Sequence, residues 1–137
     1  MGRLCAIDLG TKRIGIALSD EAKIIASPFQ TIPYKGDEKL ITAIQSLIRE
    51  KNIEKMVIGL PLNQDGSESP GCFRARSFMQ KLEAKGIFCE LFDERYSSEA
   101  AEEVLYQFGK TRKSSKGKVD MIAAAVILKG YLETQNT

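Results

Sequence analysis

Acidic residues stand at three places in the sequence where an apolar run begins or ends. Asp8 closes an apolar run near the N-terminus, and Asp93 and Glu94 follow a later one. Asp120 lies just before the apolar stretch 122–128. Carboxylates in such surroundings are costly to desolvate and repel each other when clustered, so they need a counter-charge. A divalent cation would supply it, and carboxylate oxygens suit Mg²⁺ or Mn²⁺, which could activate water against a phosphodiester.

The residue types that are missing narrow the chemistry further. The 137 residues include no histidine, so a Ser-His-Asp triad, a Cys-His pair and an HExxH zinc site are all excluded. The three cysteines, Cys5, Cys72 and Cys89, form no CxxC pair and predict neither a disulfide framework nor a zinc ribbon. A reducing cytoplasm suits this pattern. We expect Cys5 and Cys89 to be buried and Cys72, at the start of a polar segment, to be exposed.

Each acid alone also has a purely structural explanation. A single Asp at a strand end, such as Asp8, is commonly a turn or cap residue. Asp120 could simply complement the dipole of a helix that begins there. Asp93 and Glu94 could be a solvated loop pair, with Arg95 neutralising one of them. The metal-site hypothesis therefore depends on whether the fold brings all three positions to one edge of a sheet.

The hydrophobic pattern predicts the elements that would position these acids. Apolar runs bounded by turn residues predict five strands, at 3–9, 14–19, 23–32, 55–59 and 87–92. Pro28 places the third strand at an edge, because proline cannot donate to a ladder. Helical spacing predicts four helices, from 37 to 48 with Asp37 as a cap, from 72 to 86, from 97 or 98 to 108, and from 119 to 132.

This order of elements predicts the architecture. An antiparallel meander precedes two strand-helix units, and right-handed crossovers would make the later strands parallel to the first. The expected fold is α/β and ribonuclease H-like, with a five-stranded mixed sheet flanked by about four helices. Residues 1–137 are long enough for one such domain. Ligands in these sheets bind beyond the carboxyl ends of the parallel strands, where the acids stand.

Several polar residues near the acids could hold phosphate. Lys12 and Arg13 lie in the first hairpin turn, and Arg95 follows Glu94. Asn63, in the loop after the fourth strand, offers an amide to phosphate or sugar. Exposed turn cations and a plain turn are the alternative interpretations of these positions.

A cluster of cations without any acid precedes Asp120. Its members are Lys110, Arg112, Lys113, Lys116 and Lys118. A basic arm of this kind would add salt-sensitive affinity for a nucleic-acid backbone. Charge runs are usually solvated loops, but the position beside Asp120 favours substrate binding. The net charge of +2 adds no support of its own.

Four segments of the sequence resemble, in order and spacing, the YqgF family, described as pre-16S ribosomal RNA nucleases and Holliday-junction-resolvase-like proteins. They are DLGTKRIGIA at 8–17, GLPLN at 59–63 with Asp65 and Gly66, FDERYSS at 92–98, and VDMIAAA at 119–125. The resemblance covers nearly the whole chain. It implies a ribonuclease H-like fold and metal-dependent cleavage, with Asp8, Glu94 and Asp120 as the acidic triad. The family usually has threonine at the position of Ser97. The hydroxyl group is therefore kept in this sequence.

Together these observations predict a cytoplasmic Mg²⁺- or Mn²⁺-dependent endonuclease that acts on structured RNA, with processing of the 5′ end of pre-16S rRNA favoured. Resolution of branched DNA by a dimer and a non-catalytic nucleic-acid adaptor are alternatives. The segment starting at Asp8 also resembles the phosphate-binding turn of actin-like ATPases, but those clasp nucleotide between two such domains. We expect a monomer or weak homodimer. The longest apolar run, 121–128, is too short to span a membrane.

Overall fold

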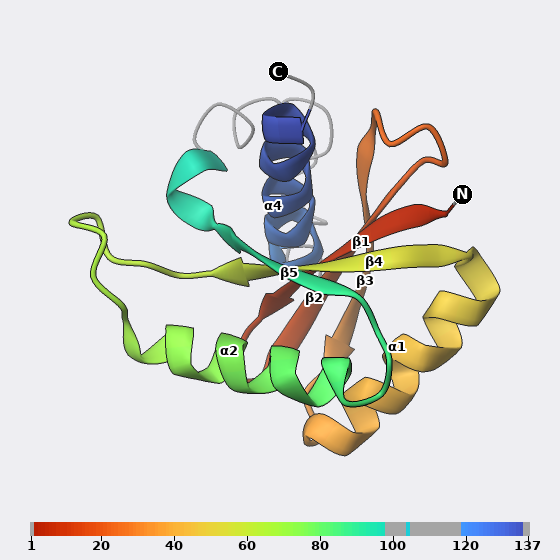
Figure 1. The fold of residues 1–137 in the computed structure, drawn as a ribbon, viewed down its shortest axis with the longest axis horizontal. Helices are drawn as coiled ribbons and strands as arrows, with labels where there is room; N and C mark the ends of the chain where they lie inside the picture. The colour runs from red at the N-terminus through yellow and green to blue at the C-terminus, as the bar shows by residue number, and fades with distance from the viewer. Residues whose placement is uncertain (1, 98–103, 105–118, 136–137) are drawn as a thin grey trace.

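The computed structural model describes residues 2–97, 104 and 119–135 (Figure 1). Five strands form one mixed sheet in the order β3-β2-β1-β4-β5. β1 pairs with β2, and β2 with β3, in antiparallel fashion, whereas β1–β4 and β4–β5 are parallel. This is the predicted mixed sheet. The strands are β1 (Arg3–Leu9), β2 (Arg13–Ser19), β3 (Ala26–Pro33), β4 (Ile53–Leu60) and β5 (Cys89–Asp93).

The helices differ in number from the prediction. Within the described ranges there are three α-helices, not four, and one 3-10 helix. They are α1 (Asp37–Lys51), α2 (Pro70–Glu83), η1 (Glu94–Ser97) and α4 (Val119–Gln135). The helix predicted from 97 or 98 to 108 lies outside the described residues, apart from Ser97 in η1 and a helical Val104. None of the helices described is long and apolar enough to cross a membrane.

The sheet has a different helical layer on each face. In Figure 1, α4 lies on one side of the sheet, and α1 and α2 lie on the other. The core between the sheet and α1 and α2 is built from large side chains such as Ile7, Ile58 and Phe78. The core under α4 contains more small side chains, Ala6 and Ala124 among them. Successive strand residues alternate between these two cores, because side chains of a strand point to opposite faces in turn.

Local chemistry explains one difference at an element end. The third strand begins at Ala26 instead of 23, because the Asp20 carboxylate accepts hydrogen bonds from the backbone N–H groups of Ile24 and Ile25, both at 2.8 Å, and closes a turn there. Pro28 does lie on an edge strand, beside a register shift in the β2–β3 pairing.

Two side chains lie in surroundings other than those predicted. Gly36 is the N-cap of α1, and Asp37 makes no cap bond; its carboxylate accepts from Lys81 Nζ and Tyr34 Oη, both at 2.6 Å. Cys72 is buried, because it lies on the inner face of α2. Cys5 is buried as expected, and Cys89 is half-buried.

Candidate active site

Asp8 lies near the end of β1 with a glycine on each side of it. Gly15 of β2 is its register partner, and the pairing of Ile7 with Ile58 places Gly59 of β4 next to it on the other side. By strand alternation all three residues point to the α4 face. The two glycines leave that face without side chains on either side of the Asp8 carboxylate, which makes room for groups from elsewhere in the chain.

The two glycine positions are filled by the other predicted acids. A Cβ at Gly15 would overlap the backbone oxygen of Asp120, so the first turn of α4 rests directly on β2. A Cβ at Gly59 would lie 2.9 Å from Glu94 Oε2, so this carboxylate occupies the space above Gly59. Asp120 and Glu94 therefore approach Asp8 from opposite sides. Sequence reasoning identified Gly59 as a point of close approach but gave no role to Gly15.

The electrostatics of Asp8 and Glu94 reflect this approach. Burial raises the pKa of Glu94 to about 7 from an ordinary value of 4.5, and repulsion from Asp8 and Asp93 makes a smaller contribution in the same direction. Burial and then repulsion from Asp120 raise the pKa of Asp8. The Asp8 side chain makes no hydrogen bond or ion pair within the described part of the chain. The site thus holds poorly solvated carboxylates whose negative charge a cation would stabilise.

Asp120 is engaged with a cation of the protein itself. Arg13 Nε lies 2.7 Å from Asp120 Oδ2, although the Arg13 side chain is otherwise mostly exposed. Among the described residues, no set of three acidic side chains is arranged so that it could hold a metal ion. The fold brings Asp120 to the neighbourhood of Asp8, but its carboxylate is directed at Arg13.

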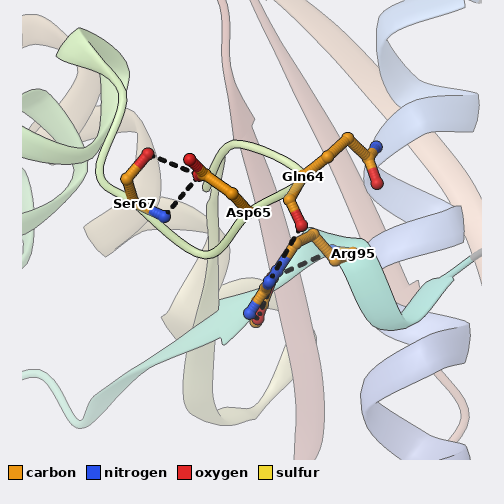
Figure 2. Close-up of polar contacts among 5 residues, drawn as sticks. Gln64, Asp65, Ser67 and Arg95 are labelled. Atoms are coloured by element: carbon orange, nitrogen blue, oxygen red, sulfur yellow. Dashed lines mark hydrogen bonds and ion pairs between the residues drawn. The ribbon is translucent and has the colours of Figure 1, made fainter.

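The two neighbouring acids at the end of β5 have different partners. Arg95 holds the Asp93 carboxylate through both Nε and Nη2, the shortest contact being 2.7 Å, and this lowers the pKa of Asp93. Arg95 Nη1 also donates to the carbonyl of Gln64 at 3.4 Å (Figure 2). Asp93 and Arg95 therefore tie the loop of residues 61–69 to the end of β5, and Glu94 is the acid directed towards Asp8.

The remaining predicted binding residues are dispersed. Lys12 is exposed in the first hairpin turn. The Asn63 side chain donates to Ser67 Oγ at 3.0 Å, within its own loop. The Asp65 carboxylate accepts from the backbone N–H and the hydroxyl of Ser67 and so stabilises the same turn (Figure 2). The basic cluster lies outside the described residues; its members are Lys110, Arg112, Lys113, Lys116 and Lys118.

A cavity of about 370 Å³ opens beside the acids. Asp8 and Glu94 line it together with Arg74 and the first residues of α2, Pro70 and Gly71. Sequence reasoning missed Arg74, because an arginine inside an amphipathic helix carries no signal that distinguishes it from an exposed one. A larger cavity, of about 470 Å³, lies between α1 and α2; it contains the Asp37–Lys81 pair and shares no residue with the acid site.

The fold is that of solved Holliday junction resolvases. The structure of Thermus thermophilus RuvC in complex with a Holliday junction substrate superposes with a TM-score of 0.66, covering 99% of this chain and 96% of that one at 10% identity. The yeast mitochondrial resolvase Ydc2 gives a TM-score of 0.61, covering 98% of this chain and 79% of that one at 15% identity. The fold is thus ribonuclease H-like, as the sequence predicted, and the comparison adds its similarity to RuvC.

The sequence defines the family more narrowly. This chain belongs to the RuvX family, also called YqgF, whose model is described as Holliday junction resolvase and matches residues 2–134. A relative from Anaeromyxobacter dehalogenans named "Putative pre-16S rRNA nuclease" is 42% identical over 132 residues, 96% of each chain. A relative of the same name from Clostridioides difficile is 38% identical over 133 residues, 96% of this chain and 94% of its own. Both names are those of enzymes that hydrolyse phosphodiester bonds.

Proposed function

We propose that residues 1–137 form a metal-dependent endonuclease domain that cleaves structured RNA in the cytoplasm, with the 5′ end of pre-16S rRNA as the substrate. One observation carries the proposal: Asp8 stands between Gly15 and Gly59 at the end of β1, Glu94 occupies the space above Gly59, and burial raises the pKa of both carboxylates. The names of the relatives favour RNA over DNA.

The residues present suit a hard divalent ion. Asp8 and Glu94 offer carboxylate oxygens in partly buried surroundings that raise the pKa of both groups, and this donor set fits Mg²⁺ or Mn²⁺. Asp120 would join them once its bond with Arg13 opens, whereas Asp93 is held by Arg95. When bound, such an ion stabilises charge on a phosphoryl oxygen and lowers the pKa of a water.

The protein's own cations would orient the substrate. Arg13 is mostly exposed and adjacent to the acids, so its guanidinium can exchange the Asp120 carboxylate, which it holds through Nε, for a phosphate oxygen. Such an exchange would hold the scissile phosphate and release Asp120 for the ion in one step. Lys12 and the cations between residues 110 and 118 would bind the backbone further along, and Arg95 and Asn63 would act by holding the loop 61–69.

The name of the family model and the resolvase fold favour a second candidate, cleavage of four-way DNA junctions. Paired cleavage of a junction needs two active sites related by symmetry, and therefore a dimer. A monomer or weak homodimer suits the RNA reaction. The mass in solution, measured with and without each substrate, separates the two activities.

The test compares wild type, Asp8→Asn and Glu133→Gln on a pre-16S rRNA fragment and on a four-way DNA junction, with Mn²⁺ or with EDTA. Glu133 is an exposed acid of α4 and serves as the charge-matched control. We expect Asp8→Asn to lower the cleavage rate at least about 10³-fold, because metal stabilisation of the transition state is worth several kcal/mol. Cleavage in EDTA, or by all three proteins alike, would contradict the proposal. RNA binding without cleavage by wild type would indicate the adaptor.

A further inference from the structure

Arg74 projects from α2 into the surroundings of the acid site. Its Nη1 donates to the backbone carbonyl of Gly10 at 2.6 Å, in the turn that follows β1. Its guanidinium carbon lies 4.7 Å from the centre of the Tyr34 ring. A carbonyl on one edge and an aromatic face therefore hold the guanidinium in one place, beside the cavity that Asp8 and Glu94 also line.

Arg74 forms no direct ion pair with a carboxylate in the described part of the chain, although its charge, after that of Lys81, helps to lower the pKa of Asp37. Its Nη2 is buried without a hydrogen-bond acceptor, and within the described ranges no carboxylate oxygen lies within 4 Å of the guanidinium. Arg76, two residues further along the same helix, forms an ion pair with Glu68. Buried guanidinium nitrogens nearly always have an acceptor, because a desolvated charge is costly. Arg74 is thus held in position with one buried nitrogen, Nη2, for which the described part of the chain provides no acceptor.

The cavity selects the kind of anion. One wall carries the carboxylates of Asp8 and Glu94 and the other carries Arg74 at the start of α2, where backbone N–H groups also favour negative charge. A single small anion could contact only one of these two walls at a time. A strand with phosphates at regular intervals can place one phosphate against the acids and its neighbour against Arg74.

We propose that Arg74 binds the phosphate next to the scissile one, so that the α2 side of the cavity is a second phosphate subsite. The proposal rests on the proposed nuclease function for the identity of the scissile phosphate. A purely structural role, in which Arg74 only fixes the turn at Gly10, would account for Nη1 but leaves Nη2 without an acceptor. The guanidinium fork suits a phosphate, which accepts at two oxygens at once.

The test measures binding, not cleavage. Anisotropy of a fluorescein-labelled single-stranded RNA in EDTA, across salt concentrations, is compared for wild type, Arg74→Gln and Arg76→Gln. Loss of one phosphate contact lowers the slope of log K against log salt by about 1 and weakens binding to any sequence. We expect this for Arg74→Gln and a wild-type slope for Arg76→Gln, which removes the same charge from the exposed face of the same helix. A wild-type slope for folded Arg74→Gln overturns the proposal.

A second, conservative variant tests the proposal if Arg74→Gln does not fold. Arg74→Lys keeps the charge and can reach the Gly10 carbonyl, but it loses the fork. We expect it to bind the same RNA severalfold more weakly than wild type with an unchanged salt slope. Affinity equal to wild type would overturn the proposal. Because EDTA prevents metal-dependent cleavage, the binding result is independent of the Asp8→Asn result, and either proposal can fail alone.

Discussion

The two faces of the sheet use the same strands for different purposes. Towards α1 and α2, β1 and β4 present Ile7 and Ile58, which are fully buried against large apolar side chains. One residue further along each strand, towards α4, stand Asp8 and Gly59. The first face is filled to exclude water. The second face lacks side chains at Gly15 and Gly59, so the first turn of α4 and the Glu94 carboxylate can approach Asp8.

This difference shows how a strand can supply stability and chemistry together. Because the side-chain period of a strand is two residues, adjacent residues face opposite sides of the sheet and differ in burial and packing. Small residues on the α4 face allow close approach, and the cost is a group of carboxylates with unfavourable burial. Substitutions on the two faces should therefore have effects of different kinds, which can be measured separately.

The largest effect on stability is expected from Ile58→Ala. Removing a fully buried side chain from the central sheet should lower the free energy of unfolding by about 3–4 kcal/mol, through lost burial and the cavity left behind. Urea unfolding measures this change. Cleavage per folded molecule should stay near that of wild type, because Ile58 points away from Asp8.

Ile24→Ala, at a position 62% exposed, is the control and should change stability by less than about 0.5 kcal/mol. Loss of activity in folded Ile58→Ala would contradict the separation of the two faces.

Gly15→Ala should cost about 2–3 kcal/mol, because its Cβ would overlap the backbone of α4 at Asp120 and force the helix away from the sheet. Gly59→Ala is the matched comparison. Its Cβ would meet the ends of two side chains, Ile127 at 2.6 Å and Glu94 at 2.9 Å, which can move more easily than a helix. Thermal unfolding should rank Gly15→Ala as the less stable. Gly59→Ala should mainly lose cleavage, by displacing Glu94, and equal stabilities would show that α4 does not rest on Gly15.

The smallest effect is expected from Glu94→Gln and depends on pH. The pKa of Glu94 is raised to about 7, so the folded state binds its proton more tightly than the unfolded state does. Its contribution to stability is present below about pH 4.5 and is lost as the pH rises through 7. Glu94→Gln should therefore be about 1–2 kcal/mol more stable than wild type at pH 8 in EDTA, after allowance for partial exposure. Denaturant unfolding at pH 4 should show no difference, and a constant difference between the two pH values would refute the assignment.

The sequence predicted the mixed sheet and placed the acids at the ends of elements, for identifiable reasons. Asp8 and Asp120 each adjoin a strongly apolar run, so their places at the end of β1 and the start of α4 follow from local pattern. The choice between Asp93 and Glu94 could not be predicted, because adjacent residues have equal claims until η1 turns the chain. Asp93 was included among the predicted metal ligands, and the structure directs it to Arg95. Whether these acids bind metal stays a prediction.

The sequence by itself determined which residues are polar, where the regular elements lie and which family the chain resembles, because these depend on local periodicity and motif spacing. The tertiary structure alone decided that Gly15 supports α4, that Arg13 holds Asp120 and that Arg74 reaches Gly10. These contacts join residues separated by 64 to 107 positions in the chain. Such contacts depend on strand register and helix packing, which local sequence patterns do not encode.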